Sequence, residues 1–383
     1  MYRRVGDSSL LAVGRPFGFA QGMLRCVQTR FLTAPERLPF SFDLAHAFCY
    51  NNAKMEKTER KLLGVIDALS GGFELVLRHP WVVLIPIALD LFLWLGPQIN
   101  AKPLFDQAIA FLSTSAPADA SAETLQNIDA VKSALQTAGD TVNVFGVMSL
   151  GLFPTLFNVR PPETDWARAV WFVVPDGAAL MLMSLPLALF GVLIASIYLE
   201  SIARAVRQKS GGAQTLAPRL IKSYVTLVAL AFLVLVGLFA FAFPVALGAT
   251  IVSMLSAGLG VFMLLGGSLI VLWAALYLAF AIPSIFVSGS SAAQAVLNSV
   301  SIFHFNFSPA ISLVFLTYLI QMGFAFIWQQ FTGTTWGVVL DVVANAFLGS
   351  GLIAALMLFY NDRFTWLTQV RERIRQQQAS LKG

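Results

Sequence analysis

Six long apolar stretches dominate the pattern of hydrophobic and polar positions along the chain. A helix needs about 20 apolar residues to cross the hydrocarbon core of a bilayer, and six windows meet or approach that length. They are residues 80–97, 178–199, 224–247, 257–286, 309–329 and 337–360. The first is short, and the fourth is long enough to require a tilt or a kink near Pro283. The pattern predicts an all-α, polytopic membrane protein with six transmembrane helices.

A gap in the charged residues supports this class. Lys222 and Asp341 are separated by 118 residues without a single Asp, Glu, Lys or Arg, whereas about one residue in four is charged in a soluble chain. Such a segment could not cover a water-facing surface, so its solvent is lipid. The composition of the whole chain, 57% hydrophobic and 12% charged, agrees.

The distribution of Lys and Arg predicts the orientation. With a cytoplasmic N-terminus, segments 54–79, 200–222 and 361–383 face the cytoplasm and together hold 15 Lys or Arg. The connections on the outer side hold only Lys102, Lys132, Arg160 and Arg168. Because cytoplasmic loops carry an excess of Lys and Arg, we predict a bacterial cytoplasmic membrane protein with both termini inside.

The connection 98–177 is the only sizeable polar region between spans. Stretches 102–112 and 122–135 place apolar residues at helical spacing and predict a small helical cap on the outer side. The apolar stretch VNVFGVMSLGLFPTLF (142–157) is not expected to form a seventh span, because that would move the basic segment 200–222 outside. We expect this stretch to pack on the outer surface or dip into the interface.

Amphipathic segments are predicted on the cytoplasmic side. Stretches 61–78, 212–222 and 291–303 each precede an odd-numbered span. The tail 361–383 places apolar residues at helical spacing opposite several arginines, which suits a helix on the anionic inner leaflet or one that docks a cytoplasmic partner.

Residues 1–54 differ from the remainder of the chain. They hold both cysteines and show no long apolar run, so neither a signal peptide nor a packed domain is expected. Within them, RPFGFAQGMLR (15–25) resembles the translated product of short intergenic repeats of some bacterial genomes. We expect a disordered leader with a mis-assigned start and true translation from Met55, or, as the alternative, a genuine disordered extension.

The expected divisions of the chain follow from these patterns. They are the leader (1–54), an amphipathic helix with the first span (55–97), the outer cap (98–177), spans two to six (178–360) and the cytoplasmic tail (361–383).

Two carboxylates lie within predicted spans, where an ionisable group costs about 2.5–3.5 kcal/mol on insertion scales and usually faces a cavity or a partner. Asp90 lies in the first span, within WVVLIPIALDLFLWLG. Asp341 lies in the last span, on a stripe of residues that recur every four positions and so share one helix face. The stripe is Gly337, Asp341, Asn345 and Gly349. Its glycines permit close approach of another helix, and its polar groups can hydrogen-bond across the contact.

Both carboxylates have two interpretations. Asp90 is either a proton or cation site on a pathway, or a neutral carboxylic acid bonded to another helix, because burial disfavours the charged form. The Asp341/Asn345 stripe is either part of that pathway or a packing seam.

Two other features predict local contacts. Glu200 and Arg204 are spaced for an ion pair. The pair Gly266 and Gly267 predicts a close helix contact or a kink.

Signatures of enzymes and of nucleic-acid binding are missing. The chain has no HExxH, P-loop, GxSxG or kinase motif and no Cys/His metal spacing, so we expect no cofactor and no metal. Of the net charge of +5, +4 falls in residues 1–54, where seven basic residues oppose three acids. There is no basic stripe with interleaved aromatic residues, so nucleic acid is not an expected partner.

One region resembles a known family. From about 220 to 363, most clearly in AIPSIFVSGSSAAQAVLNSVSIFHFNFSPAISLVFL (281–316), the chain resembles bacterial six-helix membrane domains related to the membrane part of glycerophosphodiester phosphodiesterases. The shared features are a proline near the inner end of a span, a short surface helix with Ala and Ser, and a new span. The resemblance implies a six-helix fold. It implies no phosphodiesterase activity, because the catalytic domain of those enzymes is absent.

These observations favour a non-enzymatic structural or interaction component of the membrane, with the lipid bilayer and membrane or cytoplasmic proteins as partners. The alternative is a transporter or channel for a small solute, lipid or ion that uses Asp90, Asp341 and Asn345. A water-accessible cavity reaching both carboxylates would favour transport. Carboxylates held at helix contacts in a dry core would favour the structural role.

Overall fold

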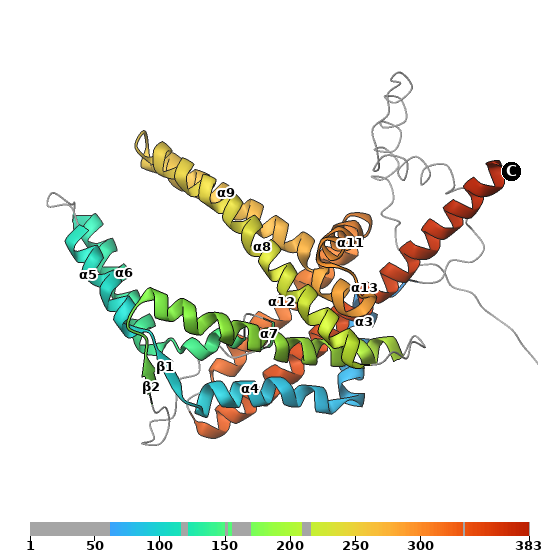
Figure 1. The fold of residues 1–383 in the computed structure, drawn as a ribbon, viewed down its shortest axis with the longest axis horizontal. Helices are drawn as coiled ribbons and strands as arrows, with labels where there is room; N and C mark the ends of the chain where they lie inside the picture. Colours follow the sequence, from blue (N-terminus) through green and yellow to red (C-terminus); the bar gives the residue numbers. More distant parts are fainter. Residues whose placement is uncertain are drawn as a thin grey trace, which may run out of the picture. The chain divides into compact units, whose positions relative to one another are not determined.

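The computed structural model describes residues 62–115, 122–149, 152–154, 170–208, 216–331 and 334–382. The expected leader 1–54, with its segment 15–25, lies outside the described residues. In chain order the elements are α3 (Val65–Arg78), η1 (Pro80–Val83), α4 (Leu84–Leu95), β1 (Gln98–Asn100), α5 (Lys102–Ser115), α6 (Ala122–Thr141), η2 (Val144–Met148), β2 (Val170–Val173), α7 (Gly177–Gln208), α8 (Leu216–Ser253), α9 (Ala257–Leu278), α10 (Ala281–Pro283), the π-helix η3 (Ser284–Ser288), α11 (Ala292–Phe305), α12 (Phe307–Gln329) and α13 (Thr335–Lys382). Helices make up most of the described chain (Figure 1).

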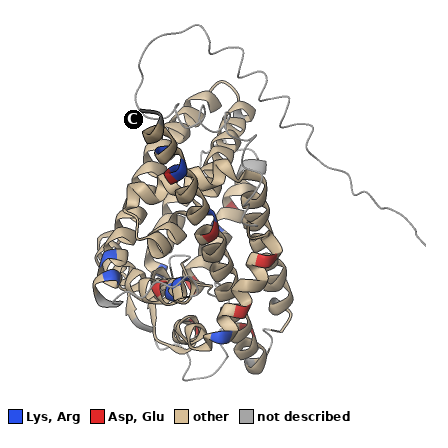
Figure 2. Cartoon of the chain, turned by 90° about the vertical axis from the view of Figure 1, so that its right-hand side faces the viewer, with Lys and Arg blue, Asp and Glu red and all other residues tan. Residues whose placement is uncertain are grey.

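Five helices in the described part of the chain are long and apolar enough to cross a membrane. They are α7, α8, the helix that runs from α9 through η3, α12 and α13. A sixth crossing exists if α3 and the η1–α4 arm form one span, although these are bent by 92°. The predicted all-α, membrane-spanning class is therefore confirmed, and Figure 2 shows how sparse charged residues are along the helices. The short parallel pair of β1 and β2 was not predicted.

The bend between α3 and α4 follows from the local sequence. Proline lacks a backbone N–H and its ring clashes with the preceding turn, which kinks or breaks a helix, and Pro80 begins η1 two residues after the end of α3. The N–H of His79 still donates to the carbonyl groups of Leu75, at 3.1 Å, and Val76, at 3.0 Å. The predicted amphipathic helix 61–78 and the predicted first span thus exist as two arms at a sharp angle.

Helix α3 packs closely along α13. A β-carbon at Gly72 would lie too near the carbonyl oxygen of Gly351 for both to fit, so glycine is required for this approach. At the start of α3, the N–H of Leu63 donates to Asp362 at 2.9 Å, and Arg363 donates to the carbonyl of Leu63 at 3.0 Å. Lipid tails are as apolar as leucine, so close packing and interhelical hydrogen bonds must hold such helices together.

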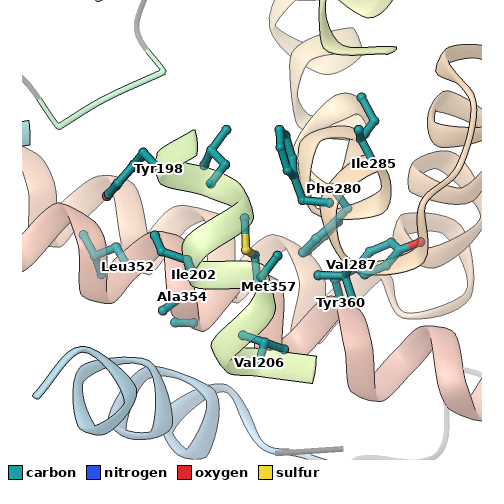
Figure 3. Close-up of a cluster of buried hydrophobic side chains, with 14 of the residues drawn as sticks. Tyr198, Ile202, Val206, Phe280, Ile285, Val287, Leu352, Ala354, Met357 and Tyr360 are labelled. Atoms are coloured by element: carbon teal, nitrogen blue, oxygen red, sulfur yellow. The ribbon is translucent and has the colours of Figure 1, made fainter. Parts of the chain in front are cut away.

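The main core lies where α7, α13 and the region around η3 meet (Figure 3). Its labelled members are Tyr198, Ile202 and Val206 of α7, Leu352, Ala354, Met357 and Tyr360 of α13, and Phe280, Ile285 and Val287. Tyr198 keeps its hydroxyl satisfied by a 2.8 Å hydrogen bond with Ser350, and Phe280 stacks on Phe359 with ring centroids 5.6 Å apart. The core therefore joins helices from the middle and the end of the chain.

The long fourth apolar window is broken close to the kink predicted near Pro283. Helix α9 ends at Leu278, and Phe280 leaves helical geometry with φ −98° and ψ 4°. Ser299 of α11 repairs the break: its hydroxyl accepts from the N–H of Phe280 at 3.0 Å and donates to the carbonyl of Tyr277 at 2.6 Å. One side chain thus satisfies two backbone groups that the break leaves without helical partners.

Helices α8 and α9 form a hairpin, and each of them packs more extensively against the other than against any other element. Its outward side chains are apolar and exposed, as Phe232, Phe239 and Phe262 illustrate. A β-carbon at Gly267 of α9 would lie 2.6 Å from Cγ1 of Val245 on α8, so this glycine lies at the helix contact. Such a surface suits lipid or another membrane protein as its neighbour.

Two of the predicted cytoplasmic helices are present in a different form. The tail 361–383 is not a separate helix, because α13 continues without a break from Thr335 to Lys382, with neither Gly nor Pro after Gly351 until residue 383. Residues 216–222 of the predicted helix 212–222 are the first turns of α8. In contrast, the stretch 291–303 forms α11, a distinct helix.

The connection 98–177 contains the two helices predicted for it. α5 and α6 pack together, with Gly139 against Phe105 and an ion pair of 2.5 Å between Lys102 and Asp140. The hydrogen bond and attraction from Asp140 raise the pKa of Lys102 above its usual value. Asn143 then links this hairpin to β1, because its side-chain oxygen accepts from the N–H of Ile99 at 3.1 Å.

The α3–α13 contact predicts opposite effects for two neighbouring glycines. Gly72→Ala should destabilise the protein by about 1–3 kcal/mol, the usual cost of overpacking, because its β-carbon meets the backbone of Gly351 and Ala355. Gly71→Ala should be neutral or stabilising by about 0.5–1 kcal/mol, because alanine favours a helix and only a side-chain atom of Leu358 lies near, at 3.4 Å. Unfolding in detergent measures both, and equal effects of the two changes would contradict this packing.

Candidate functional site

The predicted interfacial stretch 142–157 enters the bundle much more deeply than the sequence suggested. Its described part, here called the inserted segment, comprises residues 142–149 and 152–154. The ring of Phe153 stacks on Tyr198 of α7 at 5.5 Å between centroids. Tyr198 is 21 residues, or about 30 Å, along α7 from Gly177. The segment therefore packs into the helix bundle as far along α7 as Tyr198, whereas the sequence predicted packing on the outer surface or at the interface.

Two glycines make room for the inserted segment, and an aromatic contact packs against it. A β-carbon at Gly191 of α7 would overlap the carbonyl of Met148, and one at Gly349 of α13 would overlap the ring of Pro154. Phe145 meets Phe92 of α4 edge to face at 5.3 Å. Irregular backbone at membrane depth is tolerated only inside protein or beside water, and the segment's Val144, Met148, Ser149 and Phe153 are buried.

Asn345 fastens the inserted segment to two helices. Its amide nitrogen donates to the carbonyl of Pro154 at 2.6 Å, and its oxygen accepts from Nε2 of Gln321 on α12 at 2.9 Å. The residue is 3% exposed, so both bonds are shielded from water. The amide predicted to hydrogen-bond across a helix contact therefore bonds to α12 and also to a non-helical segment.

The two membrane carboxylates lie on helices that pack against each other. Asp90 of α4 is 4% exposed and Asp341 of α13 is 2% exposed. The contact between the helices is made by Trp94 against Val338 and Val342. Oδ1 of Asp341 is buried and has no hydrogen-bond partner among the described residues. The geometry thus places both carboxylates at or beside the α4–α13 contact.

The four glycines singled out by the sequence have different surroundings. Gly349 receives Pro154, and Gly337 packs on the carbonyl of Phe331 in the turn before its own helix. Gly267 meets α8, but nothing lies within 4 Å of a β-carbon built at Gly266. Of the predicted pair, Gly267 therefore lies at a close helix contact and Gly266 does not. The two glycines of the α13 stripe thus contact the inserted segment and a turn, not another helix. The four-residue periodicity could not reveal these partners.

A second polar cluster lies where α7, α8 and η3 meet. Glu200 of α7 is 1% exposed and pairs with Arg207, and its Oε1 is 3.4 Å from Nε of Arg219 on α8. Arg207 also donates to the carbonyl of Phe286, and Arg219 donates to the carbonyls of Phe286 and Val287 at 3.0 Å each. The predicted Glu200–Arg204 pair is wrong, because Arg207 two turns away and Arg219 take that role.

Sequence reasoning missed this cluster, although a signal exists. Glu200 is the only acid between Asp176 and Asp341, and five basic residues follow it before the long uncharged segment. A single acid among several bases marks a pairing site, and the spacing from Glu200 to Arg207 is two helical turns on one face. The participation of Arg219 comes from tertiary structure.

Hydroxyl and amide groups complete the region beside η3. The hydroxyl of Tyr360 donates to Ser284 at 2.9 Å, and Asn298 donates to Ser284 at 3.2 Å and to Ser290 at 3.0 Å. Ser288 lies 3.0 Å from the Tyr360 hydroxyl. These bonds join η3 to α11 and α13. No three His, Cys, Asp or Glu side chains in the described ranges are grouped so as to hold a metal ion.

Comparison with known proteins gives no match: no model of a protein family, no curated protein and no solved structure is similar to the chain. The class of protein therefore rests on the helices themselves, which define an integral membrane protein. The resemblance to the membrane part of glycerophosphodiester phosphodiesterases stays a prediction.

The buried cluster predicts that Glu200 contributes far more to stability than an exposed acid does. Glu200→Ala leaves two arginines without their acid, and breaking a buried ion pair in this way costs about 3–5 kcal/mol. The matched control is Glu74→Ala, which removes an exposed ion pair with Arg78 and should cost no more than about 1 kcal/mol. Unfolding in detergent compares the two, and a similar loss from both would contradict a structural role for the cluster.

Proposed function

We propose that this protein is a non-enzymatic integral component of a bacterial cytoplasmic membrane that acts through structure or through interaction with other membrane proteins. The observation that carries the proposal is that the side-chain amide of Asn345 is fully engaged within the protein. It forms one hydrogen bond with α12 and one with the inserted segment. In a pathway, a polar side chain must be able to exchange partners with a solute. Here both ends of the amide are engaged within the protein.

The surroundings of the carboxylates support the same proposal. Asp90 and Asp341 are buried at or beside the packed contact of α4 and α13, where Trp94 meets Val338 and Val342. The α8–α9 hairpin supplies a large apolar surface toward lipid or a partner protein. We propose six spans, with α3 and α4 as one broken crossing and the α5–α6 hairpin as the outer cap.

A transporter or channel is the second candidate, and one observation favours it. The buried Oδ1 of Asp341 has no hydrogen-bond partner among the described residues, and Asp341 lies one turn before Asn345, which the inserted segment reaches. Discontinuous helices and irregular backbone at membrane depth commonly form the binding sites of transporters. In this proposal, a proton, cation or small solute would bind at Asp341.

Thiol accessibility at the two carboxylates distinguishes the candidates. Asp341→Cys and Asp90→Cys, each in a chain with Cys26→Ser and Cys49→Ser, should resist a small water-soluble thiol reagent in intact membranes, because both positions are buried. Ser113→Cys on the exposed face of α5 is the labelling control. Labelling at position 341 that a particular solute blocks would replace the structural proposal with transport.

The proposed orientation is tested by labelling from opposite sides. Ser113 of α5 and Ser380 of α13 are both exposed. In intact cells, a membrane-impermeant thiol reagent should label the Ser113→Cys variant and should label Ser380→Cys only after the membrane is opened, because the basic segments are proposed to be cytoplasmic. The reverse pattern would invert the orientation. Labelling of both in intact cells would contradict the odd number of crossings proposed between them.

A further inference from the structure

A pocket of about 560 Å³ lies between α8, η3 and the turn that leads into α11. Its lining residues are Pro218, Arg219, Lys222, Ser223, Thr226, Ile285, Ser288, Gly289 and Ser290. Pockets for small molecules usually measure about 300–1,000 Å³. The volume therefore suits the headgroup of a lipid or a molecule of similar size.

The charge around the pocket is positive. Arg219 and Lys222 line it, and Arg207 shares with Arg219 the carbonyl of Phe286. Among the described residues, Glu200 is the acid that pairs with Arg207 and Arg219 in this cluster. Glu200 can neutralise one of the three cations, so the cluster and pocket together keep a net charge near +2. Positive charge beside a polar pocket favours an anionic ligand.

Two of the lining groups have donors available for a ligand. Lys222 is exposed, and it forms no ion pair with a residue in the described ranges. The hydroxyl of Thr226 likewise forms no hydrogen bond within the part of the chain that the structure describes. Arg219 is held in place by the carbonyls of Phe286 and Val287, so its positive charge is fixed at the pocket wall. An ammonium and a hydroxyl beside a fixed guanidinium suit a phosphate group.

The start of α11 adds to this preference. Gly289 adopts the left-handed conformation, with φ 70°, and turns the chain so that α11 begins at Ala292. Ser291 makes no side-chain cap to the first turn. The positive end of the helix dipole therefore lies beside the wall formed by Ser290.

The surface next to the pocket faces lipid. Ile221 and Val225, on either side of Lys222 along α8, are 65% and 58% exposed. From Ser223 onward α8 carries no charged residue, so Lys222 marks the boundary between the polar and the apolar part of the helix. A ligand with a phosphate in the pocket can therefore lay acyl chains on the apolar face of α8.

We propose that this pocket binds the phosphate group of an anionic phospholipid, with Lys222, Arg219 and Thr226 at the phosphate and with acyl chains along Ile221 and Val225. Basic pockets between transmembrane helices on the cytoplasmic side commonly bind such headgroups. The inference goes beyond the proposed function. It depends only on the protein lying in a membrane, so it holds whether or not position 341 is accessible to water.

Lipid binding to the purified full-length protein in a neutral detergent tests the proposal. Phosphatidylglycerol should bind saturably and phosphatidylcholine should not, as measured by native mass spectrometry. Lys222→Gln should weaken phosphatidylglycerol binding about fivefold, the change expected when one basic residue is lost beside anionic lipid. Because Lys222 is exposed, this variant should fold. Thr226→Leu, which places a larger apolar side chain at the pocket wall, should also weaken binding.

The control variant is Arg375→Gln, which removes an exposed basic residue of α13 outside the pocket. Its lipid binding should stay unchanged. An equal loss of phosphatidylglycerol binding in Lys222→Gln and Arg375→Gln would mean diffuse electrostatic attraction and would overturn the site.

A third experiment uses inorganic phosphate alone at millimolar concentration. Binding of inorganic phosphate that Lys222→Gln abolishes, without saturable lipid binding, would make the ligand a soluble phosphate and overturn the lipid assignment.

Discussion

Backbone groups released at helix breaks constrain this structure more than any other feature. Inside the hydrocarbon region no water can bond a free N–H or carbonyl group, and each unsatisfied group costs several kcal/mol. The chain nevertheless breaks between Leu278 and Ala281 and introduces the inserted segment, which is irregular outside the short helix η2. At the first break Ser299 satisfies both Phe280 and Tyr277. At the inserted segment Asn345 satisfies Pro154. Both side chains come from neighbouring helices, so the breaks and the packing depend on each other.

The charged cluster follows from the same constraint. The π-helix η3 ends at Ser288, and the carbonyls of Phe286 and Val287 accept from Arg207 and Arg219. A guanidinium that donates to these carbonyls carries its positive charge into a partly buried environment. A buried charge without a partner destabilises the fold. Glu200 balances that charge from α7. The one acid of this region is thus explained by the carbonyl groups of a helix in another part of the chain.

Properties of single segments could be predicted from the sequence, whereas partners could not. Apolar length and the placement of Lys and Arg identify the spans, because each apolar segment partitions into the bilayer largely independently of the others. How deeply a segment packs into the bundle, and which side chains it pairs with, depend on other segments of the chain. The stretch 142–157 contains its own breaker, Pro154, but the room for it comes from Gly191 and Gly349, which lie far away in sequence. Likewise Arg204 suits Glu200 by spacing, but Arg207 and Arg219 bond it because η3 holds them there.

The same reasoning separates Asp341 and Lys222 from the other polar groups described above. Asn345, Ser299, Arg207 and Arg219 each bond a backbone group that would otherwise be exposed to an apolar environment. Within the described residues, neither Asp341 nor Lys222 does so, since Oδ1 of Asp341 has no partner and Lys222 forms no ion pair. A chain with 118 uncharged residues between these two positions uses charge sparingly. Neither residue supports the backbone, so the transport candidate starts at Asp341 and the lipid proposal starts at Lys222.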